Sequence, residues 1–101
     1  MNPEAIFKEA RAAAITAVET GGPEGAMSGF AWVTIHPARG IFVNWLKKNG
    51  HGKNGWSGGW MIWNPGEYGG QCIDLKYAGA WSFAKVLEKY GIWAEAGSRF
   101  D

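Results

Sequence analysis

The sequence has one cysteine, Cys72, in 101 residues. An internal disulfide framework is therefore excluded, and a reducing compartment is favoured. No run of apolar residues approaches the roughly 20 residues that a membrane-spanning helix needs. The N-terminal segment carries acidic residues and lacks a long apolar core, which argues against a signal peptide. We therefore predict a cytoplasmic protein that does not bind membranes.

An excess of either charge is also lacking. Ten basic residues stand against nine acidic ones, so the net charge is +1. A charge this small exerts no long-range attraction on a polyanion. Any binding of nucleic acid would have to rest on a local basic patch.

Apolar residues, in contrast, are abundant. They make up 47% of the chain, and aromatic residues make up 15%, including seven tryptophans. A chain of this length and composition can bury one packed core, so we predict a single domain over residues 1–101. Seven tryptophans are unusual in so short a chain, and their placement bears on function.

Three segments have the apolar spacing of amphipathic helices. The first, residues 3–20, begins with a proline suited to a first helical turn. The second, residues 38–49, is followed by Gly50, and the third, residues 78–90, is followed by Gly91. A glycine at this position can close a helix in the left-handed conformation. We therefore predict helices over these three ranges.

Four further segments have the alternation or the short apolar run of strands, at residues 30–35, 60–63, 71–76 and 92–96. The middle two flank the turn "NPGEYGG" and are expected to pair as a hairpin. After the first helix the order is strand, helix, strand, strand, helix, strand, which is the split βαβ order of the ferredoxin-like fold. We therefore predict an α+β ferredoxin-like domain over residues 30–101, with a four-stranded antiparallel sheet, two helices on one face and an extra N-terminal helix.

Alternation within the strands predicts two very different sheet faces. The face toward the helices would carry Ala31, Val33, Ile35, Ile73, Leu75, Ile92, Ala94 and Ala96. The other would carry Phe30, Trp32, Thr34, Cys72, Asp74, Trp93 and Glu95, joined by Trp60 or Trp63. Large apolar patches on monomers usually mark a contact. Three covers are possible for this aromatic face: the N-terminal helix, a second copy of the chain in a homodimer, or a ligand.

Three basic residues are candidates for binding an anion. In the predicted topology Lys53, Lys76 and Arg99 converge at one end of the sheet, near the start of a helix, where free backbone amides favour negative charge. The alternative is a solvated glycine loop at 50–59 with scattered charges. The loop does not match a Walker phosphate loop, because Lys53 is followed by Asn54 and the loop follows a helix.

The segment "HPARG" suggests a second anion site at the opposite end of the sheet. His36 and Arg39 lie there at the start of a helix, and Arg39 could hold a carboxylate or phosphate in a bidentate contact; the alternative is a surface salt bridge. His36, His51, Cys72 and Asp74 do not have the spacing of a zinc site. We therefore predict no metal and no other cofactor.

No catalytic signature is present, so we predict that the protein is not an enzyme. Cys72 has no base beside it in the sequence and is expected to be a buried thiol. Asp74 and Glu95 would lie about 10 Å apart on the aromatic face, a separation that inverting glycosidases use, but a chain this short is not expected to form a deep cleft. Trp81 lies off the apolar stripe of its helix and, with Trp32, Trp63 and Trp93, is a candidate contact residue for a protein partner.

Three stretches, "GFAWVTIHPARGIFVNWLKKNG", "GGWMIWNP" and "AGAWSFAKVLEKYGIWAEAGSRFD", resemble a group of small uncharacterised proteins of tailed bacteriophages and prophages. The resemblance covers residues 29–101 and implies a viral protein in the host cytoplasm. Small phage proteins often bind host or bacterial defence proteins, so a non-enzymatic binding protein is the first expectation. The alternatives are a binder of a small anionic ligand or nucleotide, and a binder of single-stranded nucleic acid on the sheet, where Asp74 and Glu95 would repel phosphates.

Overall fold

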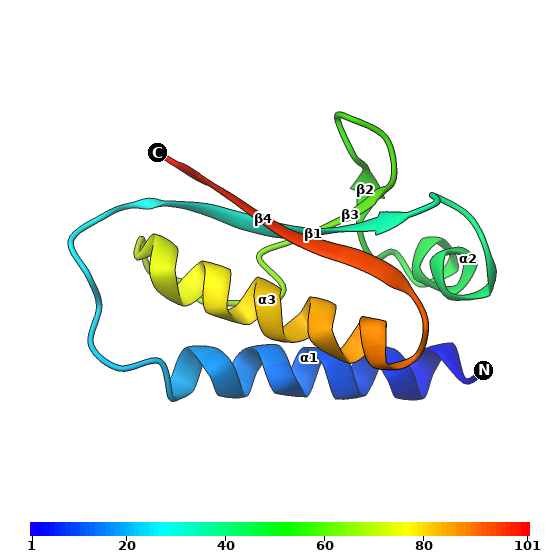
Figure 1. Ribbon diagram of the computed structural model, residues 1–101, viewed down its shortest axis with the longest axis horizontal. Coiled ribbons are helices and arrows are strands. Elements are labelled where there is room, and N and C mark those ends of the chain that lie inside the picture. Colours follow the sequence, from blue (N-terminus) through cyan, green and yellow to red (C-terminus); the bar gives the residue numbers. More distant parts are fainter.

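A four-stranded antiparallel sheet lies on one side of three helices in the computed structural model, which describes residues 1–101 (Figure 1). The strand order across the sheet is β2-β3-β1-β4. The elements are α1 (Pro3–Glu19), β1 (Gly29–His36), α2 (Ile41–Lys48), β2 (Lys53–Asn54), β3 (Trp60–Trp63), α3 (Ile73–Lys89) and β4 (Trp93–Phe100). The predicted α+β class and the four-stranded antiparallel sheet are confirmed.

Helix α1 has the start that its sequence predicts. Pro3 occupies the first turn, and the Oδ1 atom of Asn2 accepts a hydrogen bond from the Ala5 amide at 3.1 Å. This bond satisfies one of the amides that a helix start leaves without a partner. The helix ends at Glu19, within one residue of the predicted end.

Helix α2 is shorter than the predicted range of 38–49. Gly40 precedes it with a φ of +106°, a backbone conformation that favours glycine and does not belong to a right-handed helix. The apolar stripe therefore becomes helical only from Ile41. Phe42, Val43 and Leu46 are its buried residues.

The predicted strand at 71–76 is wrong, because this segment forms the first turn of α3. Ile73 and Leu75 alternate as in a strand, but Ile73, Lys76 and Ala80 also follow one another at helical spacing, and this spacing continues to Leu87. The long helical stripe outweighs the short alternation. The first residues of this segment still lie beside the start of β1, where Gln71 accepts a hydrogen bond from the Gly29 amide at 3.1 Å and Cys72 forms an isolated bridge with Ser28.

The second strand lies instead inside the predicted glycine loop at 50–59. β2 has two residues, and it pairs with β3 through Lys53 opposite Met61 and Asn54 opposite Trp60. Two residues cannot show a period-two pattern, which explains why the sequence did not reveal this strand. The predicted hairpin of 60–63 with 71–76 is replaced by the hairpin of β2 with β3.

Strand β1 is central, with β3 on one side and β4 on the other. Trp32 lies opposite Trp63 of β3 and opposite Gly97 of β4. β4 runs to Phe100, four residues beyond the predicted end. The prediction stopped early because residues 97–100 lack the apolar alternation that marks a half-buried strand. Every residue of β4 is in register with β1, without a bulge.

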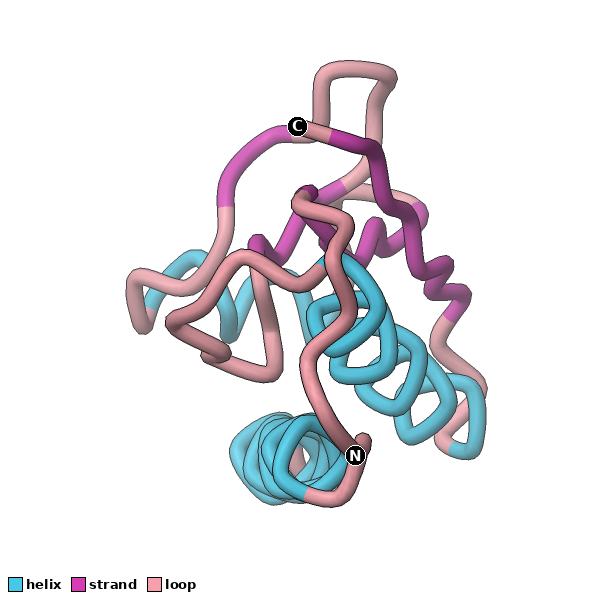
Figure 2. Tube along the Cα trace, turned by 90° about the vertical axis from the view of Figure 1, so that its left-hand side faces the viewer, coloured by secondary structure: helices cyan, strands magenta, loops and turns pink.

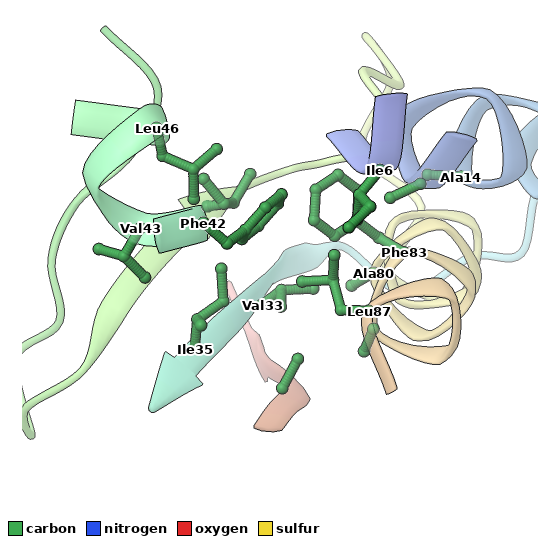
Figure 3. Packing of buried hydrophobic residues seen from close by; sticks show 14 of the residues in the cluster. Ile6, Ala14, Val33, Ile35, Phe42, Val43, Leu46, Ala80, Phe83 and Leu87 are labelled. Atoms are coloured by element: carbon green, nitrogen blue, oxygen red, sulfur yellow. The ribbon is translucent and has the colours of Figure 1, made fainter. Parts of the chain in front are cut away.

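The core lies between the sheet and the helices, and Phe42 of α2 and Phe83 of α3 point toward each other within it (Figure 3). Ala31, Val33, Ile35 and Ala94 supply the strand side of this cluster, which confirms the predicted inward positions in these two strands. Burying a side chain such as Phe83 is worth roughly 1.5–3 kcal/mol. Ile6, Ala10 and Ala14 bring α1 into the same cluster.

Helix α1 packs on the helical side of the molecule, against α3 (Figure 2). The two helices approach closely at Gly79, where an added Cβ would lie 3.2 Å from Val18 and 3.0 Å from the Gly66 Cα atom. α1 therefore does not cover the aromatic sheet face, and one of the three predicted covers is excluded. None of the helices combines the length and the apolar character needed to cross a membrane.

Candidate functional site

The sheet face away from the helices, here called the open face, carries a cluster of large aromatic side chains. Phe30 and Trp32 reach it from β1 and Trp63 from β3, because residues paired directly across an antiparallel sheet point to the same side. Trp56 joins them from the β2–β3 loop. We call Phe30, Trp32, Trp56 and Trp63 the aromatic cluster.

The sequence left open whether Trp60 or Trp63 points outward, and the structure decides for Trp63. Trp63 is 40% exposed. Trp60 is three positions earlier and lies opposite the inward-facing Ile35. It packs against the core, and its Nε1 donates to the His51 carbonyl oxygen at 2.9 Å. Trp60 therefore takes no part in the open face.

The aromatic cluster has the geometry of a platform with a wall. The rings of Trp32 and Trp63 are parallel to within 3°, with centroids 5.8 Å apart. Trp56 stands at 66° to both, at 5.2 Å from Trp32 and 6.1 Å from Trp63, and is 60% exposed. Phe30 extends the platform at 5.5 Å from Trp63. Offset and tilted ring pairs at these distances are the favourable arrangements of aromatic side chains.

The absence of a side chain at Gly97 leaves room for the Trp32 ring, which packs directly over the backbone of β4 at this position. A Cβ at this position would lie 2.7 Å from Trp32 Cε2 and Nε1. Glycine within a strand often marks such a close approach. Gly97 was not among the predicted site residues, although a glycine in the strand facing a tryptophan is a usable signal once the register is known.

The three predicted anion-binding residues are brought together around this cluster. The Arg99 guanidinium lies 5.5 Å from the Phe30 centroid and 5.8 Å from the Trp56 centroid. The Lys53 ammonium is 5.7 Å from the Trp63 ring. Cations at such distances are attracted by the ring faces. In this site, the cationic groups of Lys53 and Arg99 therefore lie close to the aromatic rings of the cluster.

Lys76 is the third of these cations, and it is buried. Its side chain lies in the first turn of α3 with 8% exposure, and its ammonium donates to the Gly29 carbonyl oxygen at 2.8 Å and lies 5.2 Å from the Phe30 ring. No carboxylate pairs with it. Lys76 therefore adds positive charge beneath the platform, while Lys53 and Arg99 are the cations that a ligand can reach.

Four of the nine acidic side chains, Glu4, Glu9, Glu67 and Glu88, form ion pairs with lysine or arginine. Glu9 accepts hydrogen bonds from Lys89 and Tyr90, and these bonds lower the pKa of its carboxyl group. Arg11 donates to Glu67 at 3.0 Å through its Nη2. Neither Lys53 nor Arg99 has a carboxylate within ion-pair distance. Two carboxylates lie in the same region, Glu67 in the lining of the same groove and Glu95 on the open face, but they contact Arg11 and His36 rather than these two cations.

The two predicted carboxylates of the aromatic face do not meet. Asp74 lies in α3, because the segment that carries it is helical. Glu95 lies at the other end of β4, where it accepts a hydrogen bond from Trp93 Nε1 at 3.2 Å and sits 3.9 Å from His36 Nε2. The predicted carboxylate pair is therefore absent and Asp74 is not on the sheet, whereas Glu95 lies on the open face as predicted.

The alternative to an anion clamp at His36 and Arg39, a surface salt bridge of Arg39, does not form. His36 packs against the Trp93 ring, with centroids 4.8 Å apart, and Arg39 makes no ion pair. The turn with Glu67, which was expected beside this segment, follows Trp63 at the opposite end of β1, and Glu67 pairs with Arg11. Of the predicted protein-contact residues, Trp81 is 50% exposed on α3 and Trp93 is 62% exposed at the start of β4, both outside the aromatic cluster.

The side chains that were considered as metal ligands lie apart. His51 stacks on Phe7, with ring centroids 4.3 Å apart. The buried Cys72 accepts a hydrogen bond from the Gly25 amide through its sulfur at 3.3 Å. No three histidine, cysteine or carboxylate side chains come close enough together to hold a metal ion.

Sequence reasoning missed Trp56 and the groove beside it. A groove of about 920 Å³ is lined by Lys53, Trp56, Trp63 and Arg99, and it continues around the β3 edge toward Phe7. The run "GWSGGW" held a signal, since an aromatic residue between glycines in a loop has little local structure in which to be buried.

No family model, curated protein or solved structure matches this chain.

Proposed function

We propose that the protein is a non-enzymatic binding protein that holds single-stranded nucleic acid on the aromatic cluster. The observation that carries the proposal is an uncovered platform of parallel tryptophan rings beside two accessible cations that have no carboxylate partner. Bases and phosphates are the two groups that such a surface complements.

Stacking supplies the affinity in this proposal. Each base that stacks on an aromatic side chain contributes about 1–3 kcal/mol, and the contribution tolerates any base. Trp56 and Trp63 are the exposed rings of the cluster, and the half-buried Trp32 is stacked in parallel with Trp63. A segment of a few nucleotides could therefore lie across β1 and β3.

Lys53 and Arg99 are placed to meet phosphates. They border the groove from the β2 and β4 sides, and both lie over rings of the cluster. The net charge of the chain is only +1, so the attraction is local. Affinity is expected to be moderate and to depend on salt.

We further propose that the domain is ferredoxin-like in its winding, as predicted. The strand order β2-β3-β1-β4 and the placement of the helices on one side of the sheet support this interpretation. RNA-binding domains that stack bases on a four-stranded sheet use aromatic residues in the same way. This likeness is one of architecture and assigns no role to any residue.

The decisive experiment measures binding of a labelled single-stranded oligonucleotide to Trp63→Ala at low salt by fluorescence anisotropy. The loss of one stacking surface should weaken binding by about 5- to 150-fold, the factor for 1–3 kcal/mol. Trp63→Phe is the matched control and should retain most of the affinity, since it keeps a ring.

Wild-type protein that binds no oligonucleotide at low salt would overturn the proposal, as would equal affinities of Trp63→Ala and wild type. Mononucleotides belong in the same assay. Binding of a mononucleotide as tight as that of the oligonucleotide would identify a small-ligand binder instead.

A protein partner is the second candidate, and the exposure of Trp81 favours it. Trp81 lies on α3, in the helical layer, and its ring is in contact with the Lys85 ammonium at 5.1 Å. Exposed tryptophan is a common anchor of protein interfaces. If the chain is of phage or prophage origin, as its resemblance implies, a host or defence protein is the partner that this candidate predicts.

A further inference from the structure

Strand β4 leaves one long edge of the sheet open. Its eight residues pair with β1 on one side only, and no other strand lies beyond it (Figure 2). The strand contains no proline, no lysine and no bulge, three of the features that normally prevent edges from pairing. Its free backbone groups are therefore available to another strand.

We infer that β4 pairs with β4 of a second copy of this chain, antiparallel, about a two-fold axis through Gly97. In a symmetric dimer each residue lies opposite a residue of the same surface in the other copy. With the axis at Gly97, Glu95 lies opposite Arg99 of the second copy, and Arg99 lies opposite its Glu95. The dimer then contains two complementary pairs.

Neighbouring registers lack this complementarity. An axis at Ser98 places Glu95 opposite Asp101 of the second copy, so that like charges face each other. An axis at Ala96 leaves Glu95 opposite a glycine. Opposite charges in directly facing positions stabilise a strand pair, and like charges destabilise it. Charge alone therefore selects the register centred on Gly97.

Neither side chain is held in an ion pair with Lys, Arg, Asp or Glu within the chain, although Glu95 accepts a hydrogen bond from Trp93 and Arg99 lies over Phe30 and Trp56. Glu95 and Arg99 lie on the open face, since they are opposite Thr34 and Phe30 of β1. The Glu95 side chain is 62% exposed, and its only ionic contact is the 3.9 Å approach to His36. Arg99 has no ion pair, and rotation about its side-chain bonds carries the guanidinium from the rings toward the strand edge.

A second observation comes from α3, which lies beneath β1 and β4. α1 packs on the side of α3 that faces α2 (Figure 2). The opposite side of α3, which borders the β4 edge, carries Tyr77 and Trp81, 38% and 50% exposed. These residues are four apart and therefore share one face of the helix.

Trp81 lies at the level of the proposed axis. The first residue of α3 is beside the end of β4, since a Cβ on Gly29 would meet both Ile73 and the Arg99 carbonyl oxygen at 2.5 Å. From Ile73 to Trp81 the helix rises about 12 Å, and from Phe100 back to Gly97 the strand extends about 10 Å. The same two-fold axis that pairs the strands thus brings the two Trp81 side chains together beneath the sheet.

Such a dimer would have one continuous eight-stranded sheet. An axis perpendicular to the sheet keeps both open faces on the same side, so the two aromatic clusters would face the same way. The exposed Tyr77 and Trp81 would be covered at the helical layer. A second copy is therefore the partner that this side of the molecule fits, and the inference does not depend on the binding of nucleic acid.

Analytical ultracentrifugation over a wide range of protein concentration tests the dimer, with Glu95→Arg and Arg99→Glu as charge reversals. Wild type should dimerise. Each reversal places two pairs of like charges at the interface and should raise the dissociation constant about tenfold or more. An equimolar mixture of the two variants should dimerise again, because every facing pair in the mixed dimer is then of opposite charge.

Wild type that stays monomeric at every concentration overturns the inference. So do single reversals that dimerise like wild type, which would show another register or another surface, and a mixture that fails to restore the dimer. Circular dichroism confirms that the variants are folded. If a reversal does not fold, Glu95→Gln and Arg99→Gln replace it, and an unchanged dissociation constant in both overturns the register.

Discussion

The position of one indole ring depends on the absence of one side chain. Trp32 lies over Gly97, and it is held in a parallel pair with Trp63. The ring is the middle of the aromatic cluster, in contact with both other tryptophans. Whatever displaces Trp32 therefore changes the shape of the whole cluster.

We predict that Gly97→Ala displaces the Trp32 ring without unfolding the protein. The new Cβ would lie 2.7 Å from two ring atoms, and the ring can move because it is only partly enclosed. Overfilling of this kind typically costs about 1–3 kcal/mol, and we expect the lower end. Urea denaturation gives the stability, and near-ultraviolet circular dichroism reports the tryptophan pair.

The neighbouring Ser98→Ala substitution is the control, since Ser98 is exposed. It should leave the tryptophan spectrum unchanged. A Gly97→Ala spectrum identical to that of wild type would show that Trp32 does not need this glycine.

The placement of α1 is the main question at the scale of elements. This helix buries its stripe against α3 and leaves the open face bare. Polar contacts at its outer edge join the two helices, where Lys89 and Tyr90 both donate hydrogen bonds to Glu9. These hydrogen bonds lower the pKa of Glu9 from its ordinary value of 4.5, because they favour the charged carboxylate.

A carboxyl group whose pKa is lowered by folding stabilises the protein above its unfolded pKa, and this stabilisation is lost as the pH falls through the folded value. We therefore predict that Glu9→Gln lowers the thermal unfolding midpoint at pH 7. The difference from wild type should shrink once the pH falls below about 4.5, where protonation begins to remove the charge from wild type as well.

Glu19→Gln provides the comparison within the same helix, because Glu19 has no ion pair. It should not lower the midpoint at pH 7. A difference between wild type and Glu9→Gln that stays constant down to acidic pH would contradict the account of this contact, since the account depends on charge.

At the scale of the whole molecule, the net charge of +1 does not describe the surroundings of the aromatic cluster. Glu9 and Glu67 form ion pairs with Lys89 and Arg11, while Lys53 and Arg99 have no carboxylate partner beside the aromatic cluster. A net charge is a sum over both sides, so it cannot predict the field at one face.

For nucleic acid held by Lys53 and Arg99, the logarithm of the binding constant should fall with the logarithm of salt concentration with a slope of about −1.4, or −0.7 for each phosphate neutralised on a single strand. Lys53→Ala should reduce the slope by about 0.7. Lys48→Ala, an exposed lysine of α2, should leave the slope unchanged. Affinities of wild type that do not change with salt would exclude phosphate contacts.

Local periodicity was sufficient to predict an element and its buried side where the element is long and repeats one pattern. It predicted α1 almost to the residue, and the alternation in β1 correctly placed Val33 toward the core and Trp32 away from it. The same reasoning failed at residues 71–76, where a few alternating apolar residues fit both a strand and the first turn of a helix. It also could not detect β2, because two residues are too few to show any period.

The candidate site was predicted in its parts but not in its assembly. The basic residues Lys53, Lys76 and Arg99 were named from the chain, but their position around Phe30, Trp56 and Trp63 depends on strand register and on a loop that folds back on the sheet.

By itself, then, the sequence determined that three helices form and which side of β1 each residue faces, because these follow from neighbours along the chain. Only the tertiary structure decided that α1 packs on α3 and that the aromatic cluster stays open. The physical reason is that the apolar stripe of α1 could have been buried either against α3 or against the open face of the sheet. The choice between them depends on shape and close approach, as at Gly79, which no local pattern encodes.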